Sequence, residues 1–168
     1  MPVRNEVDFI ERSLTALVQQ DYPPDCLEIF VVDGDSDDGT PHYVTHHREQ
    51  NPASTPQAPV RLLNNPARYM PTGFNLALRE ARGDIIIVVG NHCLIASDYV
   101  RQCVHILAQT GADCVGGPMV TQGGTYIAQA IAQAQSSPFG VGGVAFRTGQ
   151  SQGVCRHGGL WRLSARGF

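Results

Sequence analysis

The chain has 168 residues, of which 42% are hydrophobic, and this length suffices for a single α/β domain with its own core. Twelve basic residues stand against fifteen acidic ones, which gives a net charge of −3. No run of five basic residues occurs, so the charge pattern argues against nucleic acid or an anionic membrane as a partner. No apolar stretch approaches the roughly 18 residues of a membrane helix, and no signal peptide is recognisable.

Helix and strand patterns alternate along the chain. In chain order we predict a helix over 5–20, a strand over 27–34, a three-turn helix after Thr40, a strand over 60–65, a helix over 70–83, a strand over 84–90, a helix over 97–111, a strand over 112–120 and a helix over 125–137. Thr40 and Ser97 are the expected caps, and Gly83 and Gly111 the expected terminators. This alternation predicts a mostly parallel sheet with helices on both faces.

The five cysteines are odd in number and widely scattered, and none forms a C-x-x-C pair. This pattern predicts reduced thiols in the cytoplasm, and argues against a disulfide framework or a zinc site.

Two strand ends carry the candidate ligand-binding residues, because ligands of such sheets bind at the carboxyl ends of the strands. The first, "VVDGDSDDGT", holds Asp33, Asp35, Asp37 and Asp38 within six residues. Composition alone favours an acidic turn that leads into a helix, since clustered carboxylates repel unless they accept hydrogen bonds or lie near a cation. The second, "VVGNHC", ends on a glycine, an amide and an imidazole.

Three ordered blocks carry a resemblance to a known family. The stretch "PVRNEVDFIERSLTALVQQDYPPDCLEIFVVDGDSDDGT" resembles the opening of family 2 glycosyltransferases with the GT-A fold, and "NPARYMPTGFNLALREARGDIIIVV" resembles their second block. "SSPFGVGGVAFR" is similar to the subgroup that assembles bacterial exopolysaccharides of the succinoglycan type. The resemblance implies an inverting transfer of sugar from a nucleotide-diphosphate donor, expected to be a UDP-sugar, to a glycan or lipid-linked acceptor.

The resemblance also implies a nucleotide-binding set. In the family, the acid that ends the second strand accepts a hydrogen bond from the pyrimidine ring, and Asp33 matches it. Arg68 matches a basic residue that faces the phosphates. The full set is Pro2, Arg4, Asn5, Glu6, Asp33, Asp35, Arg68, Gly73 and Asn75. Alternatively, Arg68 is an ordinary solvated arginine and Asn75 a satisfied polar residue on a helix.

A divalent cation is the implied cofactor. In the wider family the strand matching 84–90 ends in Asp-x-Asp, which holds Mg²⁺ or Mn²⁺ against the diphosphate. Here Gly90 stands where the first aspartate belongs, while His92 and Cys93 agree with the subgroup. The candidate metal ligands are therefore Asn91 and His92, with binding weakened by the lost carboxylate. His92 also fits a hydrogen-bonded loop residue with no metal.

Both ends of the chain depart from the family pattern. Relatives begin with an apolar strand directly before the Pro-x-Arg-Asn-Glu segment, so we expect a sheet that lacks its first strand, with two apolar edges facing each other. Such a chain would arise from a start site placed too far downstream or from truncation.

The tail "VCRHGGLWRLSARGF", which follows Gly153, abandons the alternation of helix and strand. A basic surface-binding tail around Trp161 is one interpretation. A shift of one nucleotide near Gly153 is compatible with Val-Asp-Thr-Val-Ala-Phe-Gly, which matches the family. We therefore predict a partial GT-A domain over 1–153 and an out-of-frame or non-native tail over 154–168.

The same tail affects the expected catalytic residue. The resemblance implies that the aspartate of the Val-Asp-Thr string is the general base. That base is therefore expected in the altered segment after Gly153, where Cys155 and Arg156 stand instead. The catalytic residue of this chain is thus unknown, and we expect the chain to be inactive or impaired.

Two other classes remain open. An acidic loop after a strand also suits a receiver or a small dinucleotide-binding module, although no G-x-G-x-x-G follows the first readable strand and no lysine occurs at a matching strand end. The second of these classes is a broken coding fragment without a function of its own. Membrane association, at the cytoplasmic face, is expected only of full-length relatives.

Overall fold

A three-stranded parallel sheet forms the centre of the first of two units. The computed structural model describes residues 1–50, 57–117, 120–121, 123–137, 139 and 160–161. Its strands are β1 (Pro2–Val3), β2 (Ile29–Asp33) and β3 (Val60–Asn64), in the order β1-β2-β3. Pro2 pairs with Val32, and Val31 with Leu62. This unit comprises Met1–Cys114 with Leu160–Phe168, and the second comprises Val115–Gly159.

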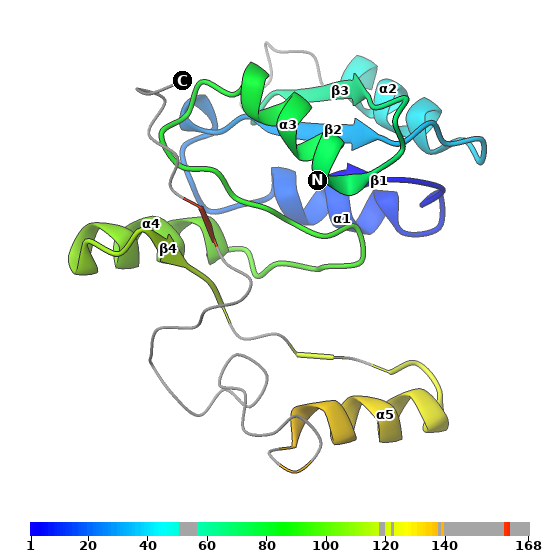
Figure 1. The fold of residues 1–168 in the computed structure, drawn as a ribbon, viewed down its shortest axis with the longest axis vertical. Helices are drawn as coiled ribbons and strands as arrows, with labels where there is room; N and C mark the ends of the chain where they lie inside the picture. The colour runs from blue at the N-terminus through cyan, green and yellow to red at the C-terminus, as the bar shows by residue number, and fades with distance from the viewer. Residues whose placement is uncertain (51–56, 118–119, 122, 138, 140–159, 162–168) are drawn as a thin grey trace. The chain divides into compact units, whose positions relative to one another are not determined.

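The helices of the first unit are α1 (Ile10–Val18), the short 3₁₀ turn η1 (Pro24–Cys26), α2 (Thr40–Gln50), α3 (Met70–Glu80) and α4 (Tyr99–Thr110). Of these, α1 and α2 lie on one face of the sheet and α3 on the other (Figure 1). Val31 is fully buried in a cluster with Leu14 of α1 and Val44 of α2. Its neighbour Val32 lies against Gly73 of α3, because successive strand residues point to opposite faces. The predicted α/β class with helices on both faces is confirmed.

The second unit contains α5 (Tyr126–Ser136), which the sequence predicts correctly. The hydroxyl of Thr125 caps it by accepting the N–H of Ala128 at 3.2 Å. The strand predicted over 112–120 is reduced to β4 (Cys114–Val115), and Leu160–Trp161 form β5. Residues 118–119 lie outside the described residues.

The predicted strand over 84–90 is wrong, because only Ile86 makes an isolated bridge. A strand needs the backbone of a neighbour to satisfy its N–H and C=O groups. Instead, a cavity of about 420 Å³ is lined by residues 85–89 on one side and by Met1, Ile29 and Phe30 on another. Residues of β2 and residues 85–89 thus line one cavity, although the latter do not form the second sheet edge that the sequence predicts.

Three predicted helix boundaries are also wrong. Helix α1 begins at Ile10 and not near residue 5, because residues 5–7 bind the loop after β2. Thr40 is the first residue of α2, and the carboxylate of Asp38 accepts its N–H at 2.9 Å. Asp98 and not Ser97 precedes α4 as its cap residue.

Helix α3 ends before the terminator that the sequence predicts. Its last residue is Glu80, and Ala81 is already extended, so Gly83 lies beyond the end. The carboxylate of Glu28 accepts the N–H groups of Arg82 and Gly83 at 2.6 and 3.2 Å and holds this extended segment. Gly111 does end α4 with a left-handed φ of 64°, as predicted.

The predicted domain boundary after Gly153 lies outside the described residues. Gly153 itself is among the residues that the structure does not describe, and of 154–168 it describes only Leu160 and Trp161, the two residues of β5. The division into a partial domain over 1–153 and a non-native tail over 154–168 therefore stays a prediction.

Candidate functional site

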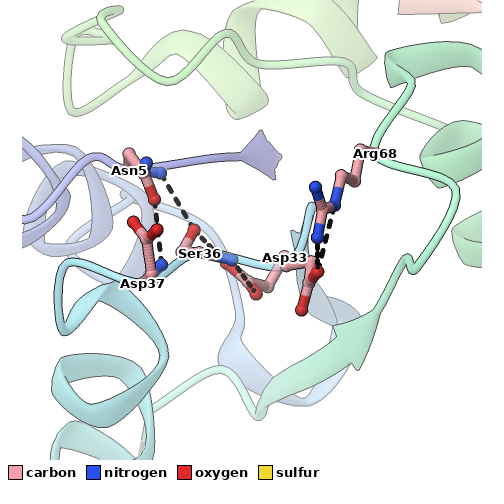
Figure 2. Close-up of polar contacts among 6 residues, drawn as sticks. Asn5, Asp33, Ser36, Asp37 and Arg68 are labelled. Carbon is pink, nitrogen blue, oxygen red and sulfur yellow. Dashed lines mark hydrogen bonds and ion pairs between the residues drawn. The ribbon is translucent and has the colours of Figure 1, made fainter.

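Hydrogen bonds join the loops that follow β1 and β2 at the carboxyl edge of the sheet. The N–H of Asn5 donates to Ser36 Oγ at 2.9 Å, and the N–H of Asp37 donates to Asn5 Oδ1 at 3.0 Å (Figure 2). The N–H of Gly34 donates to the carbonyl of Val3 at 2.8 Å, and a Cβ on Gly34 would meet that carbonyl at 3.4 Å. A Cβ at this distance makes an ordinary van der Waals contact, so the hydrogen bonds, and not the lack of a side chain at Gly34, hold the two loops together.

Asp33 ends β2 with a buried carboxylate that Ser36 orients. Ser36 Oγ donates to Oδ1 at 2.5 Å and the N–H of Ser36 donates to Oδ2 at 3.0 Å (Figure 2). Only 6% of Asp33 is exposed. A carboxylate has about four lone-pair directions, so this one can still accept a hydrogen bond from a ligand.

Asp38 has a structural role at the start of α2. Desolvation raises its pKa, but the Thr40 hydroxyl and the backbone N–H groups of Val7 and Thr40 outweigh this and hold the pKa below its usual value. The distances to Asp38 are 2.6 Å from Thr40 Oγ1 and 2.9 Å from the N–H of Val7. For this residue, the interpretation as an acidic turn leading into a helix is confirmed.

Arg68 reaches across from the loop after β3 and pairs with Asp35 (Figure 2). Its Nε donates to Asp35 Oδ2 at 3.0 Å, and a second guanidinium nitrogen contacts the same oxygen. Both side chains are about half exposed. Arg68 is therefore a half-exposed, ion-paired arginine, and its guanidinium lies at the carboxyl end of the sheet.

Backbone strain is concentrated at this edge. Among the described residues, Asn5, Asp35 and Arg68 are the non-glycine residues with positive φ, at 53°, 61° and 64°. A left-handed conformation costs a side-chain-bearing residue roughly 1–2 kcal/mol. Such outliers cluster at binding sites, where surrounding contacts hold them.

Asn65 is a site residue that the sequence analysis missed. It is 4% exposed, its Nδ2 donates to the carbonyl of Tyr69 at 2.9 Å, and its Oδ1 accepts from Thr72 at 2.9 Å. Its carbonyl also accepts the N–H of Arg68 at 2.9 Å. Asn65 thus shapes the loop that presents Arg68. The Asn-Pro pair at 65–66 is a turn signal that could have pointed to it.

A second cluster joins the loop after β1 to residues 91–92. The carboxylate of Glu6 is buried, accepts a hydrogen bond from Asn91 Nδ2, and lies 3.3 Å from His92 Nε2. Ser13 Oγ donates to the carbonyl of Asn91 at 2.6 Å, and the Phe9 ring meets His92 edge-on at 4.7 Å. We call Glu6, Asn91 and His92 the Glu6 corner.

The remaining predicted site residues take no part in the side-chain hydrogen bonds and ion pairs described above. Arg4 is exposed, and Pro2 belongs to β1. Gly73 is buried, and a Cβ there would meet Asn65 Nδ2 at 3.2 Å and Val32 at 3.3 Å, so it serves close packing of α3 on β2. Asn75 is an exposed residue of α3.

The expected general base has no counterpart among these contacts. The sequence places it in the altered segment after Gly153, and Gly153, Cys155 and Arg156 all lie outside the described residues. The described residues therefore provide the candidate binding groups of the site, and the position of the base stays a prediction.

Three further findings concern the described part of the chain. There, no group of three or more His, Cys, Asp or Glu residues could hold a metal ion. The cysteines in that part, Cys26, Cys93, Cys103 and Cys114, are all free. No helix in it is both long and apolar enough to span a bilayer.

Residues 1–164 match the family described as "Glycosyl transferase family 2", so the chain belongs to that family. It is 31% identical over 169 residues to the succinoglycan biosynthesis protein ExoA of Rhizobium meliloti (strain 1021), covering 98% of this chain and 49% of ExoA. It is 27% identical over 118 residues to the glycosyltransferase AglE of Haloferax volcanii, covering 70% of this chain and 37% of AglE. The chain thus spans less than half the length of these relatives. The resemblance found in the sequence is confirmed.

Solved structures agree with this assignment. The mannosyltransferase PcManGT from Pyrobaculum calidifontis, in complex with GDP-Man and Mn²⁺, superposes with a TM-score of 0.64 at 30% identity, over 80% of this chain and 38% of that one. TarS 1–349 of S. aureus, in complex with UDP-GlcNAc, gives a TM-score of 0.57 at 21% identity, over 71% of this chain and 36% of that one. The likeness to TarS concerns the fold, and both neighbours confirm the predicted GT-A class.

Proposed function

We propose that the chain is part of an inverting glycosyltransferase that moves a sugar from a nucleotide-diphosphate donor to a growing exopolysaccharide or a lipid-linked acceptor. The observation that carries this proposal is the network at the carboxyl edge of the sheet. It places the buried acid Asp33 beside strained loops that also hold Arg68. A ligand-binding site of the α/β class is expected at this edge.

Asp33 and Asn5 would bind the base and ribose of the donor. Ser36 fixes the Asp33 carboxylate by two hydrogen bonds, which leaves lone pairs for an N–H of a pyrimidine. Uracil carries such an N–H, so a UDP-sugar is the proposed donor. Pro2, Arg4, Gly73 and Asn75 complete the proposed nucleotide-binding set as neighbours of these loops.

Arg68 would bind the diphosphate. A guanidinium suits phosphate because it offers several donors in a planar fork. In the free chain Asp35 holds it, and this half-exposed ion pair contributes at most about 1 kcal/mol. A diphosphate can therefore displace Asp35 at little cost, and Asp35 keeps the guanidinium near the site until the donor arrives.

The Glu6 corner would hold the divalent cation that such donors require. Asn91 and His92 are the proposed ligands, and the nitrogen and oxygen donors present there fit a first-row divalent cation. Bound there, the cation would supply charge neutralisation for the leaving diphosphate. Gly90 contributes no carboxylate, so we expect this cation to bind less tightly than at an Asp-x-Asp motif.

The general base of such a transferase is expected in the segment after Gly153. We propose that residues 154–168 are out of frame or non-native, that the base aspartate is thereby replaced, and that the chain is inactive or impaired as a transferase. A nucleotide-binding module without catalysis, or a broken coding fragment, is then the second candidate. It is favoured by Cys155 and Arg156, which occupy the place expected for the aspartate.

Calorimetry with UDP- and GDP-sugars, with and without Mn²⁺, tests the proposed function. We expect saturable binding of UDP-sugars, and a loss of at least about tenfold in affinity for Asp33→Asn, which offers the pyrimidine a weaker acceptor. Glu80→Gln on the outer face of α3 is the matched control, because Glu80 pairs with Arg61. If none of the UDP- or GDP-sugars binds, with or without Mn²⁺, the result favours the broken coding fragment.

An assay of UDP release distinguishes an active transferase from a binding module without catalysis. The 168-residue chain should bind donor but release no UDP in the presence of an acceptor extract. A gene resequenced and restored to the Val-Asp-Thr frame after Gly153 should release it. An intact frame confirmed by resequencing would refute the proposed origin of the tail. We place the reaction at the cytoplasmic face of the membrane, with membrane association only in the full-length protein.

A further inference from the structure

Glu6 is a buried carboxylate without a strong cationic partner. It is 8% exposed, and in the described part of the chain no arginine forms an ion pair with it. Its oxygen Oε1 contacts the amide of Asn91 and the imidazole of His92. A buried carboxylate is costly unless a positive charge compensates it. The corner is therefore suited to receive a cation.

Hydrogen bonds hold the backbone of Glu6 between α1 and α2. The N–H of Glu6 donates to Thr40 Oγ1 at 2.9 Å, and its carbonyl accepts the N–H of Ile10 at 2.8 Å, at the start of α1. Asn91 is held to the same helix through Ser13. The loop after β1 and residues 91–92 thus form one arrangement, although 85 positions separate Glu6 from Asn91.

The spacing of Glu6 and His92 fits two neighbouring metal ligands. Ligand atoms at about 2.1 Å from an octahedral cation lie about 3.0 Å apart when they are adjacent. Glu6 Oε1 and His92 Nε2 are 3.3 Å apart. A hard divalent cation is commonly held by one or two protein groups, with phosphate oxygens and water at the other positions. Two protein ligands are therefore enough for a site completed by a donor.

We propose that Glu6 supplies the carboxylate ligand that Gly90 lacks, so that Glu6 and His92 together bind a divalent cation such as Mn²⁺ at the diphosphate end of the site. This inference rests on the proposed function. It also changes the role of Asn91, whose Nδ2 donates to Glu6 and aims the carboxylate at His92. Glu6 then binds the cation and is no longer a member of the nucleotide-binding set expected from the sequence.

Titration of the 168-residue chain with MnCl₂ tests the proposal, with the electron paramagnetic resonance signal of free Mn²⁺ as the readout. We expect one saturable site in the wild type. Glu6→Gln keeps the shape of the side chain and removes its charge, and it should weaken Mn²⁺ binding at least about tenfold. Glu80→Gln is the matched control and should bind as the wild type does. Equal binding by Glu6→Gln and Glu80→Gln would overturn the proposal.

Paramagnetic broadening locates the cation without any variant, and so remains decisive if Glu6→Gln folds poorly. Mn²⁺ should broaden the ring signals of His92 strongly, while those of His42 and His46 on α2 serve as internal references. His92→Asn assigns the His92 signals. Uniform broadening of all three rings would place the cation elsewhere and overturn the proposal.

Binding of UDP in metal-free buffer distinguishes the two proposals. If UDP binds but Mn²⁺ binds neither alone nor with UDP, the cation inference fails and the proposed function stands. If Mn²⁺ binds at Glu6 and His92 but no nucleotide binds in any condition, the proposed function fails while the cation site stands.

Discussion

Gly90 is the residue at which one added side chain should change cation binding most. A Cβ there would lie 3.3 Å from Cys93 Sγ, and because Cys93 is exposed its side chain can turn away. We expect Gly90→Asp to tighten Mn²⁺ binding about tenfold, because affinity rises with the charge of the ligand set. The measurement is the same Mn²⁺ titration. Gly90→Ala adds the Cβ without the carboxylate, and equal affinities for the two variants would contradict the prediction.

Ser36 connects Asn5 and Asp33 through one hydroxyl. Ser36→Ala removes the acceptor for the N–H of Asn5 and the 2.5 Å donor to Asp33. Each lost hydrogen bond is worth about 1 kcal/mol, so we expect the free energy of unfolding to fall by about 1–2 kcal/mol. Urea denaturation measures this. Ser97→Ala, on the exposed surface, is the matched control and should shift the midpoint little.

The acidic pattern around Asp33 predicted that several carboxylates follow β2, but not the partner that each of them has. Sequence spacing cannot show that Asp38 caps α2 while Asp35 pairs with Arg68, since partners from other loops decide each role. It also could not show that Glu6 meets His92, because that contact depends on how two distant loops come together.

At the scale of elements, an added strand that fills the apolar cavity beside β2 should stabilise the sheet. Its walls include Phe74 and Leu78 of α3 and residues 85–89. A short Val- and Ile-rich extension placed before Met1 should enter it, pair with β2 and residues 85–89, and stabilise the fold. Each fully buried Val or Ile contributes roughly 1.5–3 kcal/mol before ordering costs, so we expect a net gain of about 2 kcal/mol or more.

Thermal unfolding measures this gain, and amide exchange at residues 85–89 reports whether a strand forms there. A Gly- and Ser-rich extension of equal length is the control, because it can form backbone hydrogen bonds but buries no apolar surface. Equal melting temperatures for the two extended chains would show that the cavity does not accept a strand.

The elements that sequence predicted well are those whose signals are local. Strands β2 and β3 and helix α5 are marked by apolar patterns and, for α5, by the Thr125 cap. Residues 84–90 have an equally strong apolar pattern, yet form no strand, since strand formation depends on a neighbouring backbone. The end of α3 at Glu80 and the start of α4 after Asp98 were missed because side chains from loops distant in sequence decide them. Glu28 holds the segment after α3, and Gln20 accepts the N–H of Val100 at 3.0 Å.

At the scale of the whole molecule, the position of the α-amine of Met1 links pH to stability. This amine donates to the carbonyl of Phe30 at 2.7 Å, and burial lowers its pKa from 8.0 to about 6. In the unfolded chain the amine regains its ordinary pKa. Between pH 6 and pH 8 the unfolded state therefore binds more protons than the folded state.

The free energy of unfolding of the 168-residue chain should consequently rise with pH between about 6 and 8. The difference of about two pKa units corresponds to a gain of about 2–3 kcal/mol, because each unit is worth 1.36 kcal/mol. Urea denaturation at several pH values measures it. The N-terminally acetylated chain keeps every histidine but lacks the titrating amine, so it should lose this slope. The same slope in both chains would assign the pH dependence to the histidines instead.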